Sequence, residues 1–377
     1  MAGPPLRGVY LRPLPDPLVP ARHSAGARRR AAQLQAFLRP MHALAAERLP
    51  LVGELTLSVL GADDWRRAYR YPYGFAFTRT RPTPATLAHA SGPHVDVIVP
   101  ADHPGRLVRR FDEVLLRAAR AGVRPPPPGG GPQPHAAERD APGAGIRPAG
   151  GADPLRGAAL LERPDPTGDV RELLDLVTGH EWGHAVATLA GLRLRVTWLD
   201  ELLATVIYLA ALRDLGADAL AARVVAWAEV QAAGGDDTRR DLGAFEYPRG
   251  RLRLARSTYF QGVFTLRAWQ LVAGNTDASD DATGTTTATT NATTTGGASD
   301  RAPREPWAFV QALHAAVAPV AASSGRHRGD VARALVEVEP SFRTWFATLG
   351  ERADGADDDA ADAGDASRTS PAGHAKV

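Results

Sequence analysis

One short string constrains this chain more than any other. It is His180-Glu181-Trp182-Gly183-His184, and it lies within an apolar stretch with helical periodicity. Residues four apart share one face of a helix, so the two imidazoles can converge on a single metal ion. Glu181 lies about 100° around the helix, where its carboxylate can reach a water on the open side of that ion. By chance the pattern occurs in roughly 0.01 of chains of this composition. The alternative is an incidental histidine pair on a helix surface.

A further side chain must complete such a site, because a catalytic zinc usually has three protein ligands. The chain has no cysteine, which restricts the ligands to histidine and carboxylate. The metzincin pattern is excluded, since Ala187 and Ala190 stand where it has a glycine and a third histidine. The nearest downstream candidate is Glu201, with Asp200 as the fallback. Both carboxylates could instead complement the dipole at the start of the next helix.

Sixteen residues separate His184 from Glu201, which lies in the string WLDELLAT that ends at Thr205. This arrangement resembles the gluzincin metallopeptidases, and in particular the catalytic segment of aminopeptidase N-type enzymes. The resemblance implies that His180, His184 and Glu201 bind Zn²⁺ and that Glu181 is the general base. It also implies an α+β, zincin-like fold, in which a small sheet lies beside the active-site helix and a mainly helical C-terminal part follows.

A second similarity lies further along the chain. The segment RSTYFQG, with Tyr259 and Gly262, resembles the Y-x-x-G helix of the same family. The resemblance implies that Tyr259 donates a hydrogen bond to the oxyanion, a task that suits a phenol. Tyr208 and Tyr247 are possible substitutes, and a buried core tyrosine is the other interpretation of Tyr259. The similarity covers about residues 169–273. It does not include the G-x-M-E-N segment that binds a free amine, so aminopeptidase specificity is not expected.

Periodicity predicts strands and helices on both sides of the motif. Alternating apolar residues predict half-buried strands over residues 54–60 and 94–99. Either strand could be the edge on which zincins align a substrate, or an ordinary buried strand. The aromatic-rich segment 71–75 could line a pocket wall or form a packed turn. Helices are predicted near residues 27–48, 105–121, 169–190, 198–216, 218–232, 252–273, 307–320 and 329–349.

Composition divides the chain into seven parts. Segments rich in Pro and Gly, or in Thr, Ala, Gly and Asp, cannot bury enough apolar surface to offset their ordering entropy. The predicted parts are an irregular N-terminal segment (1–26), an α/β part with candidate edge strands (27–123), a disordered Pro/Gly-rich insert (124–153), a zinc-binding helical core (154–273), a second disordered insert (274–304), C-terminal helices (305–350) and a disordered acidic tail (351–377).

The overall charge gives no reason to expect nucleic acid or a membrane as partner. The formal net charge is +2, and among 44 basic residues only Lys376 is a lysine, which indicates a coding bias towards arginine. The most apolar run, residues 206–212, is far shorter than the ~20 residues of a membrane span. The N-terminus lacks the apolar segment of a secretory signal. We therefore expect a soluble, cytoplasmic protein.

These observations predict a zinc-dependent hydrolase. The first hypothesis is a metallopeptidase that acts on a peptide or protein. Its alternative is a non-enzymatic, zinc-stabilised helical module that binds a partner. A membrane-embedded protease with the same motif is not expected, because a spanning segment is lacking. Exo- or endopeptidase action and oligomeric state are left open by the sequence. Seven other histidines lack ligand spacing and are interpreted as structural or exposed: His89, His94, His103, His135, His314, His327 and His374.

Overall fold

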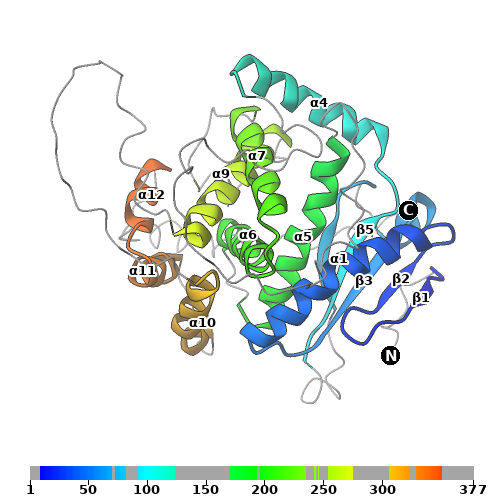
Figure 1. Cartoon of the computed structure of the whole chain (residues 1–377), viewed down its shortest axis with the longest axis horizontal. Helices are drawn as coiled ribbons and strands as arrows, with labels where there is room; N and C mark the ends of the chain where they lie inside the picture. The colour runs from blue at the N-terminus through cyan, green and yellow to red at the C-terminus, as the bar shows by residue number, and fades with distance from the viewer. Residues whose placement is uncertain are drawn as a thin grey trace, which may run out of the picture.

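The computed structural model of the chain has a mixed α+β architecture. A small five-stranded sheet lies at one side of the molecule, and helices make up the rest (Figure 1). The structure describes residues 9–69, 73–81, 92–123, 170–192, 196–234, 242, 245, 254–274, 305–321 and 328–349. The predicted disordered parts fall almost entirely outside these residues.

The sheet has the strand order β1-β2-β3-β5-β4. Its central pairs, β2–β3 and β3–β5, are parallel, whereas β1 and β4 pair antiparallel at the two edges. The strands are β1 (Arg12–Leu14), β2 (Ala21–His23), β3 (Glu54–Leu60), β4 (Phe77–Arg81) and β5 (His94–Pro100).

The two central strands are buried on both faces. Their apolar positions, such as Leu57 and Val97, pack in the main core with helices. Polar residues on the other face are buried as well, because the side chain of Arg22 in β2 lies across them. Arg22 Nη2 donates to Asp96 Oδ1 (2.9 Å), and Arg22 Nε donates to Ser58 Oγ (2.8 Å). The predicted half-buried strands are therefore fully buried, since an ion pair covers their polar side.

One helix joins the sheet to the helical part. Helix α5 (Val170–Leu189) contacts β4 and β5 on one side and α6 (Thr197–Asp214) on the other. Helix α6 is apolar on all sides and its residues from Leu202 to Leu212 are buried, as expected for a central helix. The others are α1 (Arg28–Arg48), α2 (Ala62–Ala68), α4 (Gly105–Arg120), α7 (Asp218–Gly234), α9 (Leu254–Ala273), α10 (Ala308–Ala321), α11 (Arg328–Val338) and α12 (Phe342–Thr348).

Helices α7 and α9 pack on α6 and on each other, while α10, α11 and α12 lie at the end of the molecule far from the sheet (Figure 1). Within the described part of the chain, no helix has both the length and the apolar character needed to cross a membrane.

Several predictions are corrected by this arrangement. Neither residues 54–60 nor 94–99 form an edge, since both strands are interior. The edge beside α5 is β4, a strand that was not predicted. Two short strands, β1 and β2, lie in the part predicted to be irregular. The last predicted helix, 329–349, is two helices that are separated at Pro340.

Candidate metal centre

The histidine motif lies in the C-terminal half of α5, and the helix ends where the sequence predicts. Gly191 has φ +72°, which glycine adopts without strain, and Leu192 N–H donates to the Ala187 carbonyl (2.8 Å). This reversal sends the chain back, and α6 runs antiparallel to α5. The second turn of α6 then carries Glu201 past the two histidines.

Two glycines of α5 allow the helices to approach this closely. A Cβ placed on Gly183 would lie 2.1 Å from the carbonyl oxygen of Ala204 in α6. One turn earlier, a Cβ on Gly179 would lie 2.3 Å from the ring of Tyr208. Side chains at these two positions would hold α6 away from α5. The glycines therefore set the distance between the histidines and Glu201.

The three predicted ligands meet in one place. His180, His184 and Glu201 form a group whose ligand atoms all lie within 4.8 Å of one another, and Asp200 is not part of it. Glu201 Oε2 is 3.0 Å from His180 Nε2, and Glu201 Oε1 is 3.6 Å from His184 Nε2. A tetrahedral zinc about 2.0–2.1 Å from each ligand atom would place those atoms about 3.3 Å apart. The two observed distances lie on either side of that value, so the three side chains could hold a metal ion between them.

The electrostatics keep the carboxylate ionised, as a ligand must be. Burial would raise the pKa of Glu201, but the neighbouring charges and hydrogen bonds of His184 and His180 hold it well below its usual range. Burial would likewise lower the pKa of His184, but the charge of Glu201 and its hydrogen bond outweigh burial and raise it to about 9. The Glu201 carboxylate and the His184 imidazole thus stabilise each other's charged forms.

A threonine fixes which nitrogen of His180 faces Glu201. Thr205 Oγ1 donates its one proton to the Glu201 carbonyl (3.0 Å) and lies 3.0 Å from His180 Nδ1. Because that proton is used, Thr205 can only accept from Nδ1–H, which leaves Nε2 as the metal-binding nitrogen. From α9, Gln261 Nε2 donates to Glu201 Oε2 (2.5 Å) and holds the carboxylate from the other side.

Glu181, the predicted general base, contacts the edge of the sheet. Thr78 Oγ1 of β4 lies 2.9 Å from Glu181 Oε2 and 2.6 Å from its backbone carbonyl, and can donate to either. Burial raises the pKa of the Glu181 carboxyl, with the charges of His184 and His180 acting in the opposite direction. A carboxylate with a raised pKa is better suited to accept a proton near neutral pH.

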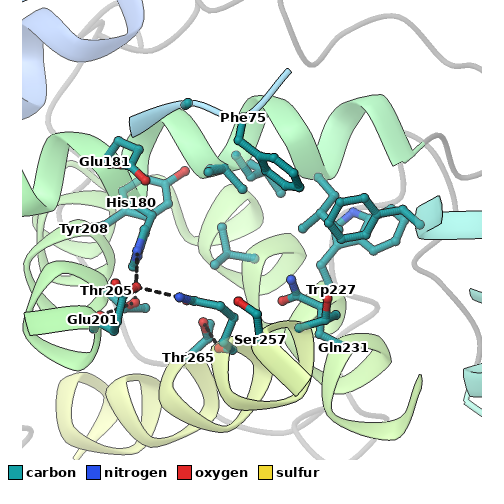
Figure 2. A pocket seen from close by; sticks show the side chains of 18 residues that line it. Phe75, His180, Glu181, Glu201, Thr205, Tyr208, Trp227, Gln231, Ser257 and Thr265 are labelled. Atoms are coloured by element: carbon teal, nitrogen blue, oxygen red, sulfur yellow. Dashed lines mark hydrogen bonds and ion pairs between the residues drawn. The ribbon is translucent and has the colours of Figure 1, made fainter. Parts of the chain in front are cut away.

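The centre opens into a cavity, so it is not sealed in the core. The ligand side chains of His180, His184 and Glu201 retain 14%, 20% and 21% of their exposure. His180, Glu181 and Glu201 line one end of a cavity of about 230 Å³ between α5, α7 and α9 (Figure 2). A ligand can therefore approach the side of the site that faces this cavity.

The predicted oxyanion donor is placed differently. Tyr259 belongs to the main core cluster, is 8% exposed and is not among the cavity residues, whereas its neighbours Thr258 and Gln261 are. Tyr208, named as a substitute, does line the cavity, and its buried hydroxyl has no hydrogen-bond partner among the described residues. Tyr247 lies outside the described residues. Gly262 has a packing role, because a Cβ there would lie 2.5 Å from the backbone of Ala232 in α7.

Two residues of the site were missed by sequence reasoning, Thr78 and Gln261. Thr78 lies more than 100 positions before Glu181, in a strand that was not predicted. Gln261 lies within the Y-x-x-G segment, two residues after Tyr259, so the segment was identified but its contact with Glu201 was not. The predicted pocket wall is confirmed at Phe75, which lines the cavity; residues 71 and 72 lie outside the described residues.

Comparisons of the chain with known protein families, curated proteins and solved structures found no significant match. The geometry of the site itself is therefore the basis for any statement about function.

Proposed function

We propose that this chain is a zinc metallopeptidase of the gluzincin type with a zincin-like fold. The observation that carries the proposal is the convergence of His180, His184 and Glu201 with Glu181 next to them, at the end of a cavity. Zinc bound by these three side chains would lower the pKa of a bound water and polarise the scissile carbonyl.

Amino-acid side chains carry out or support the remaining steps. Glu181 accepts the proton of the attacking water and later passes it to the leaving amine. Thr78 holds the Glu181 carboxylate in place for this transfer. Thr205 and Gln261 hydrogen-bond to His180 and Glu201 and orient them, as neighbours of metal ligands commonly do.

A peptide substrate is supported by the position of β4. This strand is hydrogen-bonded to β5 on one side and forms the edge of the described sheet on the other. Its residue Thr78 contacts Glu181, so the edge passes beside the general base. An extended peptide can add to such an edge through main-chain hydrogen bonds, which brings one of its amides to the metal.

Access from the cavity favours this proposal over a purely structural zinc site, which is normally closed by four protein ligands. The test is incubation of the zinc-loaded chain with a complex peptide pool, followed by mass spectrometry. We expect new cleavage sites that disappear with a chelator, return with zinc and are absent with Glu181→Gln. A chain that binds zinc stoichiometrically but cleaves no peptide would contradict the proposal and favour the zinc-stabilised binding module.

A further inference from the structure

The cavity extends well beyond the metal ligands, and its far part has a different character. Figure 2 shows His180 and Glu201 at one end and Trp227 and Gln231 at the other. The walls between them are apolar and come from helices α5, α7 and α4 and from the segment before β4. We name this part the apolar pocket, and it is formed by Phe75, Phe111, Leu173, Leu176, Val177, Val224 and Trp227.

The size of the cavity limits what it can hold. Pockets for drug-sized ligands usually measure about 300–1,000 Å³, whereas this cavity has about 230 Å³. It has room for one large side chain rather than for a whole small molecule. Since the ligand group lies at one end, a side chain in the apolar pocket would belong to a residue next to the bond at the metal.

The charge of the cavity lining also limits which side chains can bind there. Apart from His180, Glu181 and Glu201, none of the described cavity residues carries a charge. A lysine or glutamate side chain inserted there would lose its hydration without gaining a partner, which is strongly unfavourable. The lining therefore accepts an uncharged side chain and rejects a charged one.

Aromatic rings dominate the outer walls, and one of them is held rigidly. The rings of Phe75 and Phe111 meet edge to face, with centroids 6.1 Å apart. Trp227 is 1% exposed, and its indole N–H is directed to Glu172 (3.5 Å), a carboxylate that also binds Arg223 by two hydrogen bonds. This contact between α5 and α7 keeps the wall formed before any ligand arrives.

Uncharged polar side chains complete the lining. Among them, Gln231 of α7 and Ser257 of α9 are half-buried (Figure 2). These groups can satisfy a phenol hydroxyl or a peptide carbonyl. Edge-to-face packing against the aromatic walls favours an aromatic ring over an aliphatic chain.

We propose that the apolar pocket binds an aromatic side chain, phenylalanine or tyrosine, and so directs cleavage to peptide bonds next to such a residue. This inference rests on the proposed function for the cleavage step. Binding of an aromatic side chain is independent of it, because the walls of the pocket include no metal ligand.

The first test measures binding alone. N-acetyl-phenylalaninamide, N-acetyl-alaninamide and N-acetyl-lysinamide are titrated into the full-length chain, with and without zinc, and followed by ligand-observed NMR. Burial of a phenyl ring should make the phenylalanine amide bind at least about tenfold more tightly than the other two. Equal binding of the three amides would overturn the inference.

Matched variants locate the binding in the pocket. Val224→Phe places a ring in the pocket and should weaken binding of the phenylalanine amide about tenfold or more. Val225→Phe makes the same change at the next residue of α7, which is also half-buried but does not line the cavity, and should leave binding unchanged. If Val224→Phe fails to fold, Ser257→Phe fills the pocket from α9. Equal effects at positions 224 and 225 would contradict the proposal.

The peptide pool separates the two hypotheses. Cleavage sites flanked by an aromatic residue in wild type, shifting towards small residues with Val224→Phe, support both. Tight binding of the phenylalanine amide without any cleavage would refute the proposed function and leave the pocket in place. Cleavage without side-chain preference, together with equal amide binding, would refute the pocket and leave the peptidase in place.

Discussion

At the scale of single residues, the site depends on contacts one step removed from the metal. His180 has two ring nitrogens, and only one of them can face the ion. Thr205 settles the choice, since its proton is donated to the Glu201 carbonyl and its lone pair accepts from His180 Nδ1. The hydroxyl of Thr205 in α6 thus selects the tautomer of His180 in α5.

Replacement of Thr205 tests this role. Thr205→Val keeps the shape of the side chain but removes the hydrogen bond to Nδ1, and zinc affinity should fall about 10- to 100-fold. Thr205→Ser retains the hydroxyl and should stay close to wild type. The measurement is a zinc titration in competition with a chromophoric chelator. Equal affinity of the valine and serine variants would show that Thr205 does not orient the histidine.

Tyr259 can be tested in the same way. Its ring packs in the core and it does not line the cavity, so Tyr259→Phe should lower kcat by less than about tenfold. Loss of an oxyanion donor typically costs about 10²–10³ in kcat. A loss of that size with unchanged zinc content would support Tyr259 as the oxyanion donor, as the family resemblance implies. It would contradict a role in core packing alone.

At the scale of the elements, the crossing of α5 and α6 brings the ligands together. The two glycines of α5 lie one turn apart and face Ala204 and Tyr208 of the antiparallel helix. Because the two helices lie this close, the Glu201 side chain reaches both imidazoles. A modest outward shift of α6 would lengthen both distances from Glu201 beyond what one ion can bridge.

Gly183→Ala measures the importance of that crossing. The added methyl meets backbone rather than a flexible side chain, so we expect a loss of about 1–3 kcal/mol in the free energy of unfolding and a lower zinc affinity. Gly105→Ala is the control, because a Cβ at this position in α4 has its nearest neighbour at 3.6 Å. A Gly183→Ala protein with wild-type stability and affinity would show that the crossing can relax without cost.

The edge strand supplies a second element-scale prediction. Thr78→Val removes the donor to the Glu181 carboxylate and leaves the metal ligands untouched. Zinc content should stay at the wild-type level while kcat falls, and Thr78→Ser should restore it. Steady-state kinetics beside metal analysis distinguishes this outcome from a general loss of folding, in which zinc content would fall together with kcat.

How far the sequence could predict these elements depends on the range of the interactions that form them. The long helices and the strands β3 and β5 have their own periodicity and were predicted within a few residues. The three-residue strands β1 and β2 are too short for periodicity and exist because they pair with β3, directly or in turn. The histidine motif is local and needed only spacing. Thr78 and Gln261 reach the site through tertiary packing, which no local pattern records.

At the scale of the whole molecule, the site lies where the sheet layer meets the helices. Helix α5 supplies two candidate ligands and the proposed general base, α6 the third candidate ligand, β4 the contact to Glu181 and α9 the contact to Glu201. Four elements from distant parts of the chain therefore converge on one position. A metal bound there would connect α5 to α6 and stabilise the fold by mass action.

The central claim is that His180, His184 and Glu201 together bind one zinc ion. The most direct measurement is the metal content of the purified full-length chain, with X-ray absorption at the zinc edge to identify the ligand atoms. The account predicts one zinc per chain, bound by two imidazole nitrogens and carboxylate or water oxygen, in wild type and in Glu181→Gln. His184→Ala should lose it. A correctly folded wild-type chain without stoichiometric metal, even after exposure to zinc, would contradict the account.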